Sequence, residues 1–280
     1  MFRRWRLTTS GLQALILGLV QGATEFLPIS SSGHLVLVPW LLHWQNPGLA
    51  FGAMLHLGTL LAVVAFFWRD LRDLVVAGVM SLKERSLAGK PHRRMAWLIV
   101  IGTLPAAVLG LALEDLFEAL FGAPMWVGAL LVGTGTLLAV SERRSRRSRE
   151  MMELGWVDAL VIGLGQAIAI APGISRSGAT ISAGLWRGLR RDEAARFSFL
   201  LSVPIIFGAG LFELKDLLGT SSVVESPLTL VIGFASAAIS GFLSIRFLVG
   251  YLRTRSLYPF AVYCWAAGLL SILLAVLVIR

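Results

Sequence analysis

The sequence predicts an all-α membrane protein with six transmembrane helices plus two re-entrant helix–loop–helix pairs in an inverted repeat. Three observations support this fold class. Hydrophobic residues make up 56% of the chain and charged residues only 15%, whereas soluble domains have about 25% charged residues. Long apolar stretches separate short runs of charge, and one polar segment occurs twice. We therefore expect a single integral membrane domain over residues 1–280, with repeat halves at about 11–141 and 156–279.

The predicted transmembrane helices follow from length alone, because about 20 apolar residues are enough to cross a bilayer. Six stretches qualify: about 47–68, 95–113, 125–141, 194–215, 228–250 and 257–279. The single cysteine, Cys264, lies in the last stretch, so no disulfide can form within the chain.

The repeat appears when the sequence is shifted by 145 residues. Residues 15–36 then align with residues 160–181 without a gap, with 8 identities in 22 positions. Three predicted spans follow each copy. Since three is an odd number, the second half must be inverted relative to the first, an arrangement in which functional sites lie near the membrane midplane where helices are interrupted.

Each copy of the repeat contains a helix break. The first is expected to be helical to about Leu27, to break over residues 28–33, and to resume from His34 to about Trp44; the second breaks over residues 172–178. Proline and glycine end helices, and serine favours the start of the next one. Non-helical backbone at membrane depth is tolerated only when it is buried or lines a wet cavity. Two re-entrant pairs therefore predict one shared cavity.

The orientation follows from the loops. Four of them hold 18 of the 25 Lys and Arg residues: 69–94, 142–155, 186–196 and 251–256. The six-span arrangement places all four on one side and these acidic residues on the other: Glu114, Asp115, Glu118, Asp216 and Glu225. The positive-inside rule makes the basic side cytoplasmic. The first re-entrant pair then enters from outside and the second from the cytoplasm. The net charge of +9 reflects this bias, and no nucleic-acid partner is expected.

Ionisable residues within the predicted membrane region suggest a catalytic site, because their burial there is costly. Gln21 and Glu25 lie four residues apart, hence on one helix face. Their oxygens suit Mg²⁺ or Ca²⁺, which are often shared with substrate phosphates. Arg176, in the second break, can bind phosphate through two hydrogen bonds. Together with His34 these residues predict a site for an anionic substrate.

Six polar residues at the breaks are predicted to bind the substrate: Gln21, Ser30, Ser32, Ser175, Ser177 and Thr180. Structural roles are the alternative. Glu25 and Arg176 could form an ion pair that only joins the repeats, and serines or His34 could serve as helix caps. His56 is interpreted as a packing residue, and His43 and His92 as residues outside the site. The chain contains no Cys/His zinc pattern, no GxxxxGK phosphate-binding loop and no GxSxG motif.

The two breaks resemble the signature motifs of bacterial undecaprenyl-diphosphate phosphatases, the bacitracin-resistance protein family. The motifs are QGATEFLPISSSGH at residues 21–34 and PGISRSGAT at residues 172–180, and the resemblance extends over the chain in length and span order. It implies conversion of undecaprenyl diphosphate to undecaprenyl phosphate, which is reused in cell-wall synthesis. It also implies a divalent cation at Glu25 and Gln21, and a multi-pass protein of the bacterial inner (plasma) membrane with a periplasmic active site. The family's first motif begins with Glu or Gln, so Gln21 weakens a metal site that needs two carboxylates.

The catalytic residues are predicted to be Glu25, Ser31, His34 and Arg176. A serine needs an adjacent base to act as a nucleophile, so we favour attack by Ser31 with His34 as the base. His34 itself and a metal-activated water are the other candidate nucleophiles. The rival function is a polyprenyl-phosphate transporter or flippase, since inverted repeats with broken helices are typical of transporters. The sequence leaves the oligomeric state open, with a homodimer as one possible form.

Overall fold

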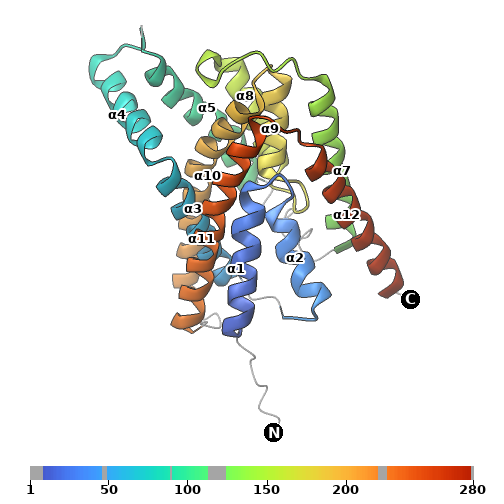
Figure 1. Ribbon diagram of the computed structural model, residues 1–280. Coiled ribbons are helices and arrows are strands. Elements are labelled where there is room, and N and C mark those ends of the chain that lie inside the picture. Colours follow the sequence, from blue (N-terminus) through green and yellow to red (C-terminus); the bar gives the residue numbers. More distant parts are fainter. Residues whose placement is uncertain (1–8, 46–48, 89, 113–123, 220–225, 279–280) are drawn as a thin grey trace.

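The computed structural model describes residues 9–45, 49–88, 90–112, 124–219 and 226–278, and within these ranges the chain is helical with no strand beyond one isolated bridge between Arg149 and Leu189 (Figure 1). The helices are α1 (Gly11–Phe26), α2 (Ser31–Leu41), α3 (Leu49–Phe66), α4 (Trp68–Glu84), α5 (Pro91–Ala112), α7 (Pro124–Arg144), a short 3₁₀ helix (Met151–Glu153), α8 (Trp156–Ile168), α9 (Arg176–Trp186), α10 (Arg191–Gly219), α11 (Pro227–Leu252) and α12 (Tyr258–Val278).

Helices that can cross a bilayer occur at five of the six predicted positions. Five described helices are long and apolar enough by themselves, namely α5, α7, α10, α11 and α12, and a sixth span is obtained if α3 and α4 are counted as one bent helix. The all-α membrane class is therefore confirmed. Many large apolar side chains on these helices are exposed, such as Leu111 and Leu228 at 69% each, as expected for surfaces that face lipid.

The segment 69–94, expected to be a basic loop, instead contains the 17-residue helix α4. The chain turns by 83° between α3 and α4, at Phe67, which begins α4 without a side-chain cap. The sequence beyond Trp68 brings Arg69, Asp70 and Arg72 in quick succession. A continued straight helix would place these charges in the apolar region, which is costly; after the bend, Asp70 pairs with Arg196 of α10.

Two helical hairpins occupy opposite halves of the molecule (Figure 1). In one half α1 runs up to a turn after Phe26 and α2 runs back; in the other half α8 and α9 form the second hairpin. The breaks lie at residues 27–30 and 169–175, close to the predicted positions. The second helix of the first hairpin begins at Ser31 rather than at His34.

Close helix crossings hold each hairpin against its neighbours. A Cβ atom added at Gly22 would collide with the Ala237 carbonyl of α11, and one added at Gly163 would collide with the Gly102 carbonyl of α5. Small residues let helix backbones approach closely in membrane proteins, where packing rather than water exclusion drives association. Glycine at these positions thus lets both hairpins lie deep between longer helices.

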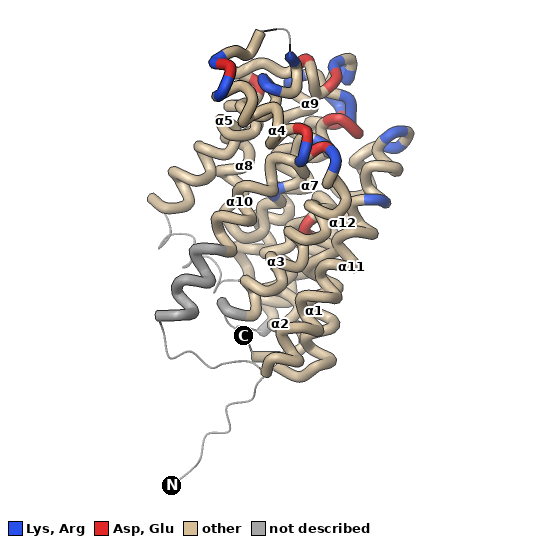
Figure 2. Tube along the Cα trace, turned by 90° about the vertical axis from the view of Figure 1, so that its left-hand side faces the viewer, with Lys and Arg blue, Asp and Glu red and all other residues tan. Residues whose placement is uncertain are grey.

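Charged residues gather at one end of the molecule, the end that carries α4, α9 and the start of α10 (Figure 2). Buried Asp158 at the start of α8 pairs with Arg149 and Arg187, and buried Glu142 at the end of α7 pairs with Arg191. Asp216 lies near the end of α10. The acidic residues predicted for the opposite side at positions 114, 115, 118 and 225 lie outside the described residues.

Candidate active site

The turns of the two hairpins bind each other through one serine from each hairpin. Ser30 Oγ donates to the Ile174 carbonyl over 3.4 Å, and Ser177 Oγ donates to the Leu27 carbonyl over 3.1 Å. Each serine therefore reaches the backbone of the opposite hairpin. This reciprocal contact brings both helix breaks to one place, as the predicted shared cavity requires.

Serine also starts the second helix of each hairpin. Ser30 caps α2 by accepting from the Gly33 N–H at 3.2 Å, and Ser175 caps α9 by accepting from the Gly178 N–H at 3.0 Å. Ser30 has φ +71°, a region that non-glycine residues rarely adopt and that often accompanies functional sites. The caps place the N-terminal ends of α2 and α9 at the junction, and helix N-termini favour bound anions.

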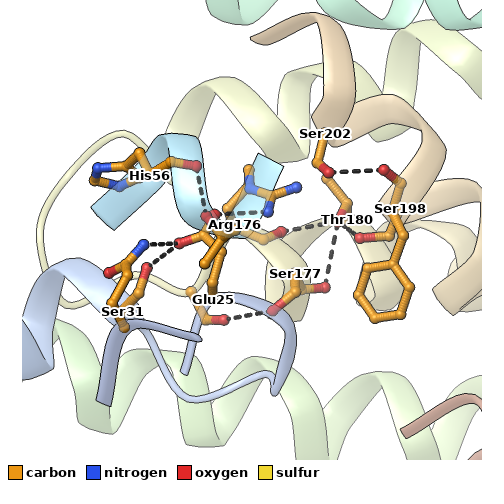
Figure 3. Close-up of polar contacts among 12 residues, drawn as sticks. Glu25, Ser31, His56, Arg176, Ser177, Thr180, Ser198 and Ser202 are labelled. Atoms are coloured by element: carbon orange, nitrogen blue, oxygen red, sulfur yellow. Dashed lines mark hydrogen bonds and ion pairs between the residues drawn. The ribbon is translucent and has the colours of Figure 1, made fainter. Parts of the chain in front are cut away.

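Glu25 is the centre of the polar cluster (Figure 3). Its Oε1 accepts from Arg176 Nη2 at 2.8 Å, and its Oε2 accepts from Ser31 Oγ at 2.5 Å and from Gln21 Nε2 at 3.0 Å. Glu25 is 6% exposed and Gln21 is fully buried. The structure therefore brings together four of the predicted site residues from both hairpins, with the carboxylate as their common acceptor.

Two polar atoms of this cluster have unused hydrogen-bonding capacity. Arg176 Nη1 and Gln21 Oε1 are both buried and have no partner among the described residues. Buried polar groups without a partner are uncommon and call for an explanation, such as a position for a ligand. A guanidinium nitrogen suits a phosphate oxygen, and an amide oxygen suits a hard cation.

His34 does not pair with Ser31 in this arrangement. Its Nδ1 lies 2.7 Å from the Ser30 carbonyl and its Nε2 lies 2.7 Å from the Tyr263 hydroxyl. Within the described part of the chain, the hydrogen-bond partner of the Ser31 hydroxyl is Glu25. The geometry thus places a carboxylate, rather than the predicted imidazole, next to the predicted nucleophile.

The remaining predicted residues lie around the junction. Ser32 Oγ lies 3.4 Å from Ser30 Oγ, and Ser175 Oγ lies 3.2 Å from Ser177 Oγ. Thr180 is buried, donates to the Arg176 carbonyl at 2.8 Å and lies 2.6 Å from Ser198 Oγ of α10. These contacts support the backbone on both sides of Arg176. Substrate contact by these residues stays a prediction.

Three residues near the site were not identified as site residues from the sequence. Thr134 of α7 donates to the Gly173 carbonyl at 3.0 Å and accepts from the Ser175 N–H at 3.1 Å, which holds the second break in place. Tyr263 of α12 binds His34. His56 of α3, interpreted as a packing residue, lies beside this polar cluster (Figure 3), and its Nδ1 is 2.9 Å from the Gly52 carbonyl. Each of them lies in a largely apolar helix, and the high cost of burying an ionisable group in a membrane is the one signal that could have marked His56 beforehand.

A divalent cation can be tested against the donors that are present. No three His, Cys, Asp or Glu side chains cluster as a metal site within the described residues. Gln21 Oε1 is an unpartnered oxygen beside the Glu25 carboxylate. Magnesium is usually held by one or two carboxylates together with substrate phosphates and waters. This donor set fits a cation that takes most of its ligands from a bound diphosphate.

Comparisons with known proteins identify the family of this chain. The family model for "Bacitracin resistance protein BacA" matches residues 14–270. The chain is 49% identical over 263 residues to the undecaprenyl-diphosphatase of Pelotomaculum thermopropionicum, covering 94% of this chain and 96% of that protein. It is 44% identical over 274 residues to the undecaprenyl-diphosphatase of Methanosphaera stadtmanae, covering 95% and 98%. The chain therefore belongs to the BacA family of bacitracin-resistance proteins.

Proposed function

We propose that this protein is a membrane phosphatase that hydrolyses undecaprenyl diphosphate to undecaprenyl phosphate and inorganic phosphate. The relatives that share almost its whole length carry the name undecaprenyl-diphosphatase. The observation that carries the proposal for this chain is the cluster of Ser31, Glu25 and Arg176, which combines a hydroxyl, a hydrogen-bonded base and an anion-binding cation. The product is a carrier lipid for cell-wall synthesis, and its regeneration accounts for bacitracin resistance.

The proposal also includes the arrangement and orientation of the protein in the membrane. Six spans cross the bacterial inner membrane, and the α1–α2 and α8–α9 hairpins are re-entrant halves of an inverted repeat. The charged end lies in the cytoplasm because Lys and Arg accumulate there. The α1–α2 hairpin then enters from the periplasm, and the site opens toward that side, where its lipid substrate would be met.

Substrate binding rests on positive charge and on free N–H groups. Arg176 Nη1 is buried and has no partner among the described residues, so it is ready to donate to a phosphate oxygen. The N-termini of α2 and α9 add backbone N–H groups and partial positive charge. Phosphoryl transfer depends mainly on positioning and on charge neutralisation. Arg176 and the two helix ends would supply both.

Ser31 is the proposed nucleophile. Its Oγ attacks the terminal phosphorus, the bond from that phosphorus to the bridging oxygen breaks, and undecaprenyl phosphate leaves. The hydroxyl proton passes to Glu25 Oε2, its hydrogen-bond partner at 2.5 Å, a distance suited to a general base. Water then hydrolyses the phosphoserine and releases inorganic phosphate. Glu25 replaces His34 as the base in this proposal because of the observed contact.

His34 has a different position in this scheme. Its imidazole lies one turn along α2 from Ser31 and is held at both nitrogens. Because both nitrogens are engaged, it can act on the departing bridging oxygen only after Nε2 takes up a proton, which it can then donate. Attack by His34 itself is the alternative, and the chemical stability of the phosphoenzyme distinguishes the two.

A divalent cation is part of the proposal. Glu25 and Gln21 would hold it through their oxygens, beside the bound diphosphate. The ion supplies neutralisation of phosphate charge when bound. Gln21 keeps its amide fixed by donating from Nε2 to Glu25, which leaves Oε1 as the free oxygen among the described contacts.

Phosphate release by the purified protein in detergent, with no membrane gradient, tests the proposal. A hydrolase releases inorganic phosphate from undecaprenyl diphosphate under these conditions, whereas a transporter does not. Absence of release from well-folded protein, with cation present, would refute the phosphatase and favour lipid transport.

A further inference from the structure

We propose that Tyr263 is a positioning residue for the reaction, which holds His34 in one orientation and one tautomer. Only the kinetic consequence of this proposal rests on the proposed phosphatase function. Tyr263 lies 229 residues after His34, in the last helix, yet its hydroxyl is 2.7 Å from His34 Nε2. The two rings are nearly parallel, with 12° between their planes and 5.7 Å between centroids.

The hydrogen bonds define the tautomer of His34. The Ser30 carbonyl can only accept, so the Nδ1 atom that lies 2.7 Å from it must carry a hydrogen. In the neutral imidazole, Nε2 is then an acceptor. The Tyr263 hydroxyl must therefore donate to Nε2. This assignment leaves the imidazole held on both sides, by the backbone of the first break and by α12.

The position of Tyr263 supports a role through His34. The neighbouring Cys264 Sγ lies 3.6 Å from the Pro28 carbonyl, so α12 is anchored to the first break directly beside the tyrosine. Tyr263 itself is 44% exposed, and the hydrogen bond that its hydroxyl makes within the described residues is the one to His34. A tyrosine placed for packing alone would not need a polar contact to a catalytic side chain.

Loss of the hydroxyl has a defined consequence. Without it the imidazole can turn about its side-chain bonds, and Nε2 loses its donor. A misplaced proton-transfer group lowers the rate of the chemical step more than it weakens binding. For Tyr263→Phe we expect kcat to fall about tenfold, as for loss of one hydrogen bond of ordinary strength, with KM within about twofold of the wild type.

The matched control is Tyr258→Phe. Tyr258 is also in α12 and is 43% exposed, but no described residue forms a hydrogen bond with its hydroxyl. This variant should keep wild-type kcat and KM. The pair of variants therefore separates loss of the His34 contact from a general effect of removing a tyrosine hydroxyl from this helix.

The deciding experiment is ¹⁵N NMR of full-length protein labelled at histidine, in detergent, beside the kinetics. The His34 signals are assigned by their loss in His34→Gln. We expect the wild type to show a protonated Nδ1 and a hydrogen-bonded, unprotonated Nε2, and Tyr263→Phe to shift the Nε2 signal toward that of a free imidazole nitrogen. A protonated Nε2 in the neutral wild type, an unchanged Nε2 signal in Tyr263→Phe, or unchanged kcat in that variant would each overturn the proposal. The wild-type spectrum can be recorded without any variant and without enzymatic activity. Its outcome therefore tests the role of Tyr263 independently of the phosphatase assignment.

Discussion

Arg176 Nη2 donates to Glu25 Oε1 over 2.8 Å, across a separation of 151 residues in the chain. The bond joins the break of the second hairpin to the first helix of the first hairpin. The side chain of Arg176 is 15% exposed and that of Glu25 is 5% exposed. If one of them were removed, bulk water could not solvate the charge of the other. The two halves of the repeat thus form one site, and each supplies a charge that the other requires.

Arg176→Lys should lower kcat/KM by about a hundredfold or more, although the charge is kept. Lysine cannot bind the carboxylate and a phosphate with the planar fork of arginine, and loss of one charge-stabilising donor costs about 10²–10³ in rate. Arg246→Lys is the control, because Arg246 is exposed and forms no ion pair within the described chain. Near-normal turnover by Arg176→Lys would make the arginine a structural partner of Glu25 only.

Ser31→Ala should abolish turnover if Ser31 is the nucleophile, and Ser32→Ala is the matched control. Ser32 lies in the same turn, but its hydroxyl contacts Ser30 rather than Glu25. Ser30 is unsuitable as a control because it caps α2. We expect a phosphoenzyme trapped from the wild type to survive acid, as phosphoserine does. An acid-labile adduct, or brisk turnover by Ser31→Ala, would assign the attack to His34 or to water.

Removal of divalent cations should abolish phosphate release, and added Mg²⁺ or Ca²⁺ should restore it. Gln21→Ala should raise the cation concentration needed for half-maximal activity, since its unpartnered Oε1 is a proposed ligand. Glu25→Gln should nearly abolish activity at any cation concentration, because it removes both a ligand and the base next to Ser31. Full activity in excess chelator would remove the cation from the account.

Cysteine labelling should report the orientation. In a Cys264→Ala background, Leu42→Cys at the end of α2 should react with an impermeant thiol reagent added to intact cells, whereas Arg146→Cys should react only after lysis. Both positions are exposed and they lie at opposite ends of the molecule, with Arg146 at the charged end. The reverse pattern would place the charged end, and with it the α8–α9 hairpin, outside.

Asp158→Asn should lower the thermal midpoint of the protein by several degrees at neutral pH. Burial acts to raise the pKa of Asp158, but hydrogen bonds from Arg149, the Gly155 N–H and Arg187 together lower it from 3.8 to about 2. Since the folded pKa lies below the ordinary value, this stabilisation is complete above about pH 4 and is lost as the pH falls toward 2. The difference between the melting curves of variant and wild type should therefore shrink over that range. A constant difference would show that the charge of Asp158 is not the cause.

The sequence allowed the helix breaks and the four central site residues to be predicted because their signals are local. Pro28 and Gly173 lie among several helix-breaking residues at the breaks, serines begin the next helix, and Glu25 and Arg176 stand out as charges in apolar surroundings. The repeated segment, which recurs after 145 residues, then indicated that the two breaks would be structurally equivalent.

The partners of these residues were harder to predict, because they depend on contacts between distant helices. His34 was assigned to Ser31 from a spacing of three residues, whereas the structure places Tyr263 at its Nε2 and Glu25 at the Ser31 hydroxyl. The place of His56 beside the polar cluster depends on how α3 packs, which apolar periodicity does not report. The 83° bend before α4 was likewise not predicted, because the sequence 69–94 was interpreted as a loop.

The most direct test of the central claim is the rate of phosphate release by purified protein in detergent, measured in parallel for the wild type, Ser31→Ala and Arg176→Lys. The account predicts one inorganic phosphate released per undecaprenyl diphosphate and none from undecaprenyl monophosphate. It also predicts losses of about a hundredfold or more in both variants, because each hairpin supplies an essential part of one site. No release by the wild type, or wild-type rates in the variant of either hairpin, would contradict it.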